Sequence, residues 1–321
     1  MPKVIHKTVH FPALPSDWNS LTGKQLCDVH KLLKHNQPQE AYKLRIFLLL
    51  SGLRILQRTG TNPDGTLTYL FRRNGWKYRL RRECLSMQAW EVSSIINRYL
   101  SFLDEPFQRT ATPCPYIRIR GRRFKGPDDL MLNITYQQYG NAQRSLLSAW
   151  ECGHEAEEMR KEGASAKAIV AKLRKAQYAR AEFLAHLFTS SSRQLFSQKD
   201  GSTHISFQRV WQYSPEAAER NVRHFLHAPD ELFGMMYQFF QSTQAVFKEK
   251  FPLLFTEYTD TDGRDALVME LETVNAVQKY AGYIRQQEVY DTNAVFIFAF
   301  LNSMSREAKA IEEMNAKLKR K

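Results

Sequence analysis

The stretch TYLFRRNGWKYRLR, residues 68–81, contains the clearest local signal in the chain. Its Asn74-Gly75 dipeptide lies between two strand-like runs and favours the two-residue type I′ turn of a β-hairpin. With a two-residue loop, Phe71 would face Tyr78 on the opposite strand. The sequence therefore predicts an antiparallel hairpin at this place.

The predicted hairpin, residues 66–82, has one aromatic face and one cationic face. Side chains alternate along a strand, so the aromatic residues would pack on a core and the cations would face outward. A second basic stretch, residues 116–127, is predicted to be a strand and an exposed loop. The two stretches supply the candidate polyanion-binding residues, which are Arg72, Arg73, Lys77, Arg79, Arg81, Arg118, Arg120, Arg122, Arg123 and Lys125.

Positive charge is concentrated in the first half of the chain. The formal net charge is +13, and residues 1–150 hold 23 lysines and arginines against 10 aspartates and glutamates, so they carry the whole excess. Arginine binds phosphate through paired hydrogen bonds, and aromatic rings can stack on bases. The charge fits a nucleic acid, but an acidic protein partner or solubility alone would also account for it.

Helical patterns dominate the rest of the chain. Thr22 and Gln25 form a predicted capping box, followed by an amphipathic segment that begins at Leu26. Further helices are predicted at 39–57, 86–103, 128–151, 155–188, 215–227, 230–248, 265–286 and 291–318. The predicted fold class is α+β and mainly helical, with a basic α+β region at 1–152 that contains the small antiparallel sheet, and a helical region at 153–321.

The last predicted helix begins with large apolar side chains on more than one side. Such a helix normally keeps a polar stripe, and here the stripe is missing for two turns. Either these turns lie between their own domain and a second protein surface, or they pass through the centre of their own domain. The candidate partner-binding residues are Phe296, Phe298, Phe300 and Leu301.

No complete catalytic, metal-binding or cofactor-binding motif occurs in the sequence. His154-Glu155 begins a zinc-protease pattern, but Glu158 stands where the second histidine is needed. Asp260 and its neighbours resemble part of a calcium loop, but Met269 occupies the position of the last ligand. We expect a non-enzymatic protein with no cofactor, metal or small-molecule substrate; a site assembled from residues distant in sequence is the alternative.

The apolar runs bear on the cellular compartment. The longest, Ala294 to Leu301, is shorter than the roughly 20 residues that a membrane-spanning helix needs. The N-terminal residues mix cations with apolar positions, unlike a secretion signal. We expect a cytoplasmic protein without a membrane partner.

The run FPALPSDWNSLTGKQL, residues 11–26, resembles the opening of a family of phage and prophage proteins that are encoded among tail genes, near the tape-measure gene. The stretches GPDDL (126–130) and TYQQY (135–139), and a last helix beginning near Thr292, are similar to the same family. Within 11–26 the chain has Asn-Ser where the family shows a glutamate before Leu-Thr. The resemblance covers about a third of the chain and implies a structural or assembly role, in the manner of tail assembly chaperones.

Two functions are therefore expected. The leading one is a non-enzymatic phage or prophage protein, located in the bacterial cytoplasm, that acts in tail assembly through contacts with other tail proteins or with itself. The alternative is a nucleic-acid-binding protein that uses the arginine-rich stretches 72–81 and 118–125.

Overall fold

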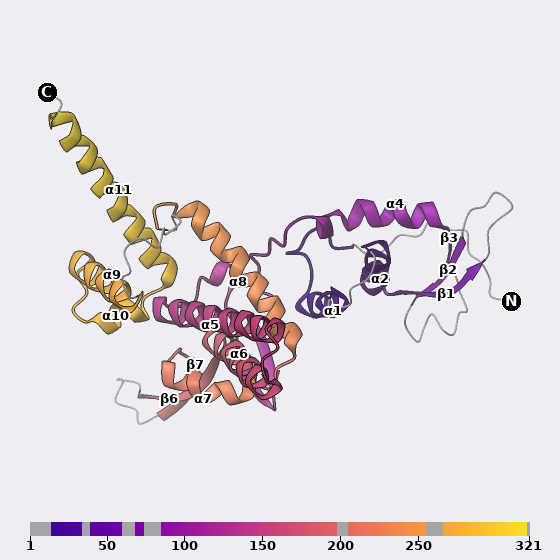
Figure 1. Ribbon diagram of the computed structural model, residues 1–321, viewed down its shortest axis with the longest axis horizontal. Helices are drawn as coiled ribbons and strands as arrows, with labels where there is room; N and C mark the ends of the chain where they lie inside the picture. Colours follow the sequence, from indigo (N-terminus) through magenta and orange to yellow (C-terminus); the bar gives the residue numbers. More distant parts are fainter. Residues whose placement is uncertain are drawn as a thin grey trace. The chain divides into compact units, whose positions relative to one another are not determined.

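The computed structural model describes residues 14–33, 39–59, 68–73, 85–197, 205–254 and 266–319. The chain divides into two compact units, Met1–Arg109 and Thr110–Lys321. This division differs from the predicted one at 152/153, because helix α5 (Tyr136–Lys161) runs through that position without a break. The predicted fold class, α+β with helices dominant, is confirmed (Figure 1).

The first unit combines helices with a three-stranded antiparallel sheet of order β1-β2-β3. Its elements are α1 (Gly23–Leu33), α2 (Gln39–Ser51), β1 (Leu53–Thr59), β2 (Thr68–Arg73), β3 (Leu85–Gln88), α4 (Ala89–Tyr99) and a short 3-10 helix, η1 (Ser101–Asp104).

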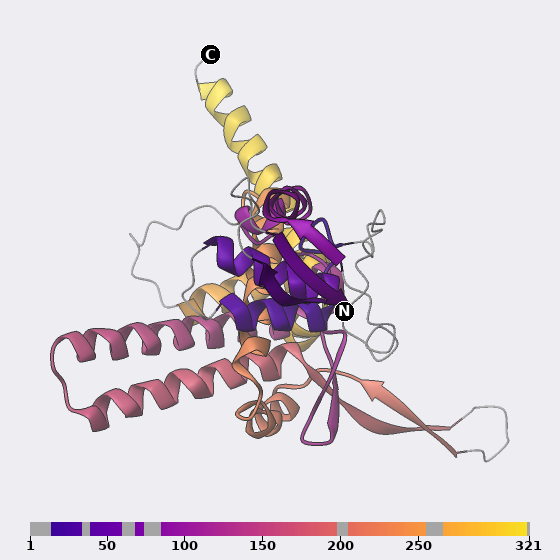
Figure 2. The same cartoon turned by 90° about the vertical axis from the view of Figure 1, so that its right-hand side faces the viewer.

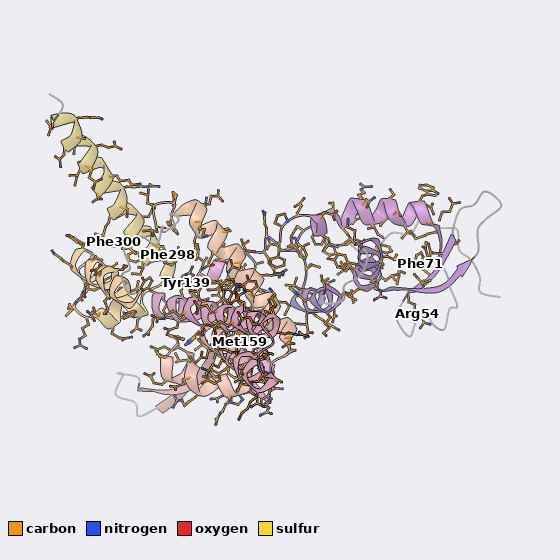
Figure 3. The ribbon with its side chains drawn as sticks, in the orientation of Figure 1. Arg54, Phe71, Tyr139, Met159, Phe298 and Phe300 are labelled. Carbon is orange, nitrogen blue, oxygen red and sulfur yellow. The ribbon has the colours of Figure 1, made fainter. Side chains whose placement is uncertain are left out.

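Strand β2 lies in the middle of this sheet. Phe71 pairs with Ile55 of β1 on one side and with Leu85 of β3 on the other. The predicted pairing of Phe71 with Tyr78 is therefore wrong, because both edges of β2 are already occupied at this residue. Phe71, which is labelled in Figure 3, is fully buried. Its position on the aromatic face of the predicted hairpin had indicated this. The predicted turn and second strand fall within 74–84, outside the described residues.

The N-terminal segment is held by a buried tryptophan and a helix cap. The ring of Trp18 lies 5.1 Å from that of Phe102 and 4.8 Å from that of Phe107. The Thr22 amide donates to Gln25 Oε1 at 2.9 Å, and the Gln25 amide donates back to Thr22 Oγ1 at 3.3 Å. The predicted capping box at the start of α1 is confirmed.

The second unit contains a four-stranded sheet of order β4-β5-β6-β7 and most of the helices. Strands β6 and β7 lie in the half of the chain that was predicted to be helical, so the sequence patterns missed them. The elements are β4 (Tyr116–Ile119), β5 (Arg122–Lys125), η2 (Asp129–Met131), α5, α6 (Ala166–Leu187), β6 (Thr189–Ser197), β7 (Ile205–Trp211), α7 (Pro215–Phe225), α8 (Asp230–Lys250), α9 (Ala266–Ala281), α10 (Gln286–Asp291) and α11 (Ala294–Lys319).

Helices α5 and α6 form a long antiparallel pair (Figure 2). The sequence predicted that the first helix ends at residue 151 and the second begins at residue 155. In the structure the break between the two helices lies later in the chain, between Lys161 and Ala166. Helix α5 continues to Lys161, and the turn that follows uses Gly163 at φ +76°. Ser165 then caps α6 by accepting a hydrogen bond from the Ala168 amide. A glycine with positive φ ends a helix, whereas Gly153 stays helical inside α5.

An aromatic core joins α5, α6, α8 and α11. The ring of Tyr139 stacks on Phe240 at 5.2 Å and meets Phe298 edge-on at 5.1 Å. Phe183 approaches Phe240 at 5.5 Å, and Phe247 approaches Phe298 at 5.6 Å. These contacts hold the first turns of α11 within the unit, as Figure 3 shows for Tyr139 and Phe298.

The remainder of α11 projects from the unit (Figure 1). Residues 306–318 are all exposed, and no other described element covers them. Among the helices that the structure describes, none is both long enough and apolar enough to span a bilayer.

Candidate anion-binding site

A two-residue turn joins β4 to β5. Arg120 and Gly121 have φ values of +48° and +78°, the two positive values that a type I′ turn requires. Ile119 and Arg122 face each other across this turn. The turn type that the sequence suggested for the first hairpin is thus found in the second unit.

The two faces of this hairpin carry different side chains. Phe124 is fully buried, with its ring 5.0 Å from that of Phe225 on α7. Because side chains alternate along a strand, Arg122 lies on the same face as Phe124, toward α7. Arg118 and Arg123, which pair across the two strands, lie on the opposite face. The hairpin therefore divides its arginines between two surfaces.

The outer face combines cations with aromatic rings. The Arg123 guanidinium lies 4.1 Å from the centre of the Tyr116 ring, which in turn lies 5.8 Å from the ring of Trp211. A guanidinium over an aromatic face is held there by the ring quadrupole. Both Arg118 and Arg123 are exposed.

Helix α7 supplies cations to the inner face. Its N-cap, Ser214, accepts a hydrogen bond from the Ala217 amide at 3.1 Å. The buried side of the helix includes Phe225, which fixes its orientation against the sheet. Arg220 and Arg223, one turn apart, are exposed.

Three arginines line one polar pocket between β5, β6 and α7. Arg122, Arg220 and Arg223 contribute to a cavity of about 660 Å³. The other lining residues are uncharged: Ser190, Ser191, Gln212, Tyr213, Ser214, Ala217 and Asn221. No carboxylate lines this pocket, and none of the three arginines forms an ion pair within the part of the chain that the structure describes. The residues that line the pocket therefore carry a net positive charge.

The positive potential is also seen at a neighbouring histidine. Burial lowers the pKa of His224, and Arg122, Arg223 and Arg120 lower it further. Its ring nitrogens have no hydrogen-bond partner among the described residues. A nearby anion would offset the repulsion between these arginines and a protonated His224.

A half-buried polar network includes Tyr213, which lines the pocket. The Tyr213 hydroxyl accepts a hydrogen bond from Asn141 Nδ2 at 2.8 Å and lies 2.9 Å from His186 Nδ1. Burial raises the pKa of Tyr213 to about 12, and burial with the nearby Arg144 lowers the pKa of His186 to about 4. Both groups are therefore uncharged at neutral pH.

The chemistry of this arrangement is that of binding. Guanidinium groups hold phosphate oxygens through paired, charge-assisted hydrogen bonds. Serine hydroxyls and the Asn221 amide, which donates to Ser190 Oγ at 3.1 Å, can add neutral hydrogen bonds. The residues that line the pocket include no histidine, cysteine or carboxylate that could act as a base or metal ligand.

The structure brings together only part of the predicted cationic set. Arg120 and Arg122 lie near the α7 arginines, and Arg118 and Arg123 lie on the outer face. Lys125 pairs with Asp128 at 3.9 Å. The remaining predicted cations belong to the first unit: Arg72 and Arg73 are in β2, and Lys77, Arg79 and Arg81 lie outside the described residues.

Two arginines of the pocket were missed by the sequence interpretation. Arg220 and Arg223 lie about a hundred residues after Arg122, in a half of the chain with no net charge excess. The available signal was their spacing of three on an amphipathic helix that begins with Ser214-Pro215. That spacing shows that the two share a helix face, but it does not reveal what the face approaches.

The predicted partner-binding residues of α11 separate into three groups. Phe298 is only 7% exposed and belongs to the aromatic core, so its proposed role as a partner contact is withdrawn. Phe300 and Leu301 pack, partly buried, against a small core of α9, α10 and α11. Phe296 is 54% exposed and stays a candidate.

Comparison with protein-family models, with curated proteins and with solved structures gives no match for this chain.

Proposed function

We propose that this protein binds a polyanion, and that the polyanion is a nucleic acid. The observation that supports this most directly is the pocket lined by Arg122, Arg220 and Arg223. Three guanidinium groups from two separate elements converge there without a carboxylate. A cluster of arginines in a pocket attracts phosphate groups.

The outer face of the hairpin favours a chain of phosphates over a single small anion. Arg118 and Arg123 extend the positive surface beyond the pocket, and the exposed Tyr116 offers a ring on which a base can stack. A single phosphate would use one of these surfaces. A single-stranded nucleic acid passing around the hairpin tip at Arg120 would use both.

The test is the salt dependence of binding to a single-stranded oligonucleotide. We expect the triple variant Arg122→Ala/Arg220→Ala/Arg223→Ala to bind more weakly than wild type. Its slope of log affinity against log salt should be shallower by about 2, since each phosphate contact on a single strand contributes about 0.7. The measurement is fluorescence anisotropy across a salt series.

A control must remove the same charge elsewhere, because any strongly cationic chain binds polyanions to some extent. Arg160→Ala/Lys161→Ala/Lys167→Ala serves this purpose, since all three residues are exposed around the tip of the α5–α6 pair. We expect this variant to keep most of the wild-type affinity and slope. Equal losses in the two triple variants would reduce the effect to net charge and refute the site.

A second function is supported by exposed apolar side chains. We propose that the protein also acts in assembly through protein–protein contacts, as the resemblance to phage tail proteins implies. Phe296 on α11 and Trp150 on α5 are exposed by 54% and 66%. A partner surface usually covers a contiguous apolar patch, so each of these two residues is a candidate position within such a patch.

The assembly role is tested by co-expression with the neighbouring genes. If the chain is encoded beside a tape-measure gene, we expect the tagged protein to co-purify with a tail protein. We expect Phe296→Ser to reduce the yield of that complex while leaving the circular dichroism spectrum unchanged. Absence of any tail gene from the neighbourhood would refute this function and leave polyanion binding unaffected.

A further inference from the structure

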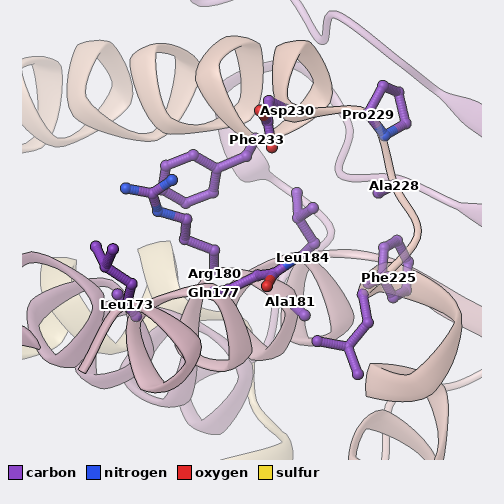
Figure 4. Close-up of a pocket in the computed structure, with 12 residues that line it drawn as sticks. Leu173, Gln177, Arg180, Ala181, Leu184, Phe225, Ala228, Pro229, Asp230 and Phe233 are labelled. Atoms are coloured by element: carbon purple, nitrogen blue, oxygen red, sulfur yellow. The ribbon is translucent and has the colours of Figure 1, made fainter. Parts of the chain in front are cut away.

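Two pockets of the second unit differ in what surrounds their arginines. Figure 4 shows the pocket beside α6 and α8, where the Arg180 guanidinium lies 5.2 Å from the centre of the Phe233 ring. Asp230 lines the same pocket, and most of the other lining side chains are apolar. The pocket between β5, β6 and α7, hereafter the arginine pocket, combines three arginines with polar, uncharged side chains and has no carboxylate in its lining. Of the two, the arginine pocket is the one suited to an anion.

Two serine hydroxyls in the arginine pocket are arranged as hydrogen-bond donors. Ser190 Oγ accepts a hydrogen bond from the Asn221 side-chain amide at 3.1 Å, and Ser214 Oγ accepts one from the Ala217 amide at 3.1 Å. A hydroxyl that accepts in this way still has its own proton to donate. Neither proton has an acceptor within the part of the chain that the structure describes. Both hydroxyls can therefore donate to a ligand that presents acceptor oxygens.

The donors of the arginine pocket are held in place by packing. Asn221 is only 2% exposed, and its bond to Ser190 joins α7 to β6. Ser214 and Ala217 bring the N-terminus of α7, with its partial positive charge, into the lining of the pocket. Glu216 in the same turn is exposed and does not line the pocket. The pocket therefore presents a preformed set of donors.

This set of donors suits a terminal phosphate better than an internal one. An internal phosphate of a nucleic-acid strand carries a single negative charge, and two of its oxygens are esterified. A phosphomonoester carries a charge of about −1.5 to −2 at neutral pH and has three strong acceptor oxygens. Each guanidinium binds phosphate oxygens through paired hydrogen bonds, so three arginines and two hydroxyls can be used fully only by the phosphomonoester.

We propose that the arginine pocket binds the terminal phosphomonoester of a nucleic-acid strand. The following phosphates then pass Arg120 at the hairpin tip toward Arg118 and Arg123 on the outer face. The cavity of about 660 Å³ lies within the range of about 300–1,000 Å³ that small-molecule ligands occupy, so it accommodates a phosphate with its nucleoside. This inference rests on the polyanion function proposed above and names the part of the polymer that enters the pocket.

The test compares oligonucleotides of one sequence that carry a phosphate at the 5′ end, at the 3′ end or at neither end. Binding to the full chain is measured by fluorescence anisotropy with an internal label. We expect wild type to bind at least one of the phosphorylated forms about tenfold more tightly than the unphosphorylated form, because of the added charge-assisted hydrogen bonds. A mononucleotide should compete about tenfold or more weakly than that oligonucleotide, since it does not reach the outer face.

Three variants locate the effect. The triple alanine variant of the pocket arginines should bind the phosphorylated and unphosphorylated forms equally. Arg118→Ala/Arg123→Ala on the outer face should weaken both forms by the same factor and keep the preference. Arg180→Ala changes an arginine of the pocket in Figure 4 and should alter neither affinity nor preference. All the substituted arginines are exposed, so the variants should keep the wild-type circular dichroism spectrum.

The possible failures of the inference differ from failure of the proposed function. Equal binding of all three oligonucleotides by wild type, weakened in the triple variant, would overturn the inference and retain the function. A preference that persists in the triple variant would place the terminal phosphate elsewhere and also overturn it. A mononucleotide that competes as strongly as the phosphorylated oligonucleotide would exclude a strand end as the ligand. Absence of any oligonucleotide binding by wild type would refute the proposed function and the inference together.

Discussion

Tyr213 and His186 are joined by a hydrogen bond of 2.9 Å between Oη and Nδ1, beneath the arginine-lined pocket. Burial, with a contribution from Arg144, lowers the pKa of His186 from 6.5 to about 4, so the imidazole in this bond is neutral at neutral pH. The support of the pocket is thus tied to pH.

The stability of the second unit should fall below neutral pH because of His186. Between pH 6.5 and about 4 the His186 imidazole binds a proton in the unfolded chain but not in the folded chain. The contribution of His186 to the free energy of unfolding is therefore fully present above pH 6.5. It is lost as the pH falls from 6.5 to about 4. The loss is at most about 3 kcal/mol.

Urea unfolding of wild type and His186→Gln at about pH 7 and about pH 4.5 measures this effect. Glutamine can still form a hydrogen bond with Tyr213, but it does not titrate. We expect the wild type to lose about 2–3 kcal/mol more than the variant between the two conditions. An equal loss in both proteins would show that other groups, such as surface carboxylates, account for the pH dependence.

Binding of an anion in the pocket should raise the pKa of His224. Arg122, Arg223 and Arg120 now lower this pKa by repulsion, and a bound phosphate would offset them. By linkage, the affinity for the anion should increase as pH falls through the titration of His224.

The His224 titration can be followed by NMR of the imidazole signals with and without inorganic phosphate or an oligonucleotide. The expected result is a higher midpoint with the ligand bound. The same titration with sodium chloride added in place of the ligand, at equal ionic strength, is the control. An equal change of the His224 midpoint in that control would indicate a general salt effect and no specific site.

Two glycine substitutions should change stability in opposite directions. A Cβ added at Gly121 or at Gly140 would meet no atom within 4 Å, so packing does not distinguish the two sites. Gly121 has φ +78°, where alanine is strained, and Gly121→Ala should cost about 1 kcal/mol or more. Gly140 lies inside α5, and Gly140→Ala should stabilise the unit by about 0.5–1 kcal/mol.

Thermal or chemical unfolding of both variants tests this pair. The comparison is informative because the same atoms are added in each case and only the backbone conformation differs. Destabilisation by Gly140→Ala would show that α5 is distorted at this position or that its exposed side is covered in solution.

A buried arginine should hold the first unit together. Arg109 is only 3% exposed and donates through Nη1 to the Leu21 carbonyl at 2.9 Å and also to the Trp18 carbonyl. Arg109→Met would leave both carbonyls without this donor in a buried place. The expected loss is about 2–4 kcal/mol, confined to the first unit.

Hydrogen exchange with mass spectrometry separates the two units without assuming a single transition. In Arg109→Met, amides of α1 should exchange faster, whereas those of α5 and α6 should keep wild-type protection. Arg98→Met, which removes an exposed arginine from α4, should change neither set. Faster exchange throughout the chain would show that the two units unfold together.

The sequence by itself determined the features that depend on neighbours along the chain. The Thr22–Gln25 cap, the buried face of α1 and the start of α7 at residue 215 each need only a few consecutive residues, and all three are present as predicted. The helical periodicity likewise predicted the mainly helical α+β fold. These signals are local because capping and amphipathic spacing act within one or two turns.

Tertiary structure alone decided how the elements combine. Phe71 pairs with Ile55 and Leu85 and not with Tyr78, since strand partners are chosen by burial of a whole face. The arginine pocket likewise depends on packing, because Phe124 of β5 meets Phe225 of α7 and thereby carries the hairpin arginines to a helix about a hundred residues away. No spacing along the chain encodes such a contact, since it arises when two apolar surfaces leave water together.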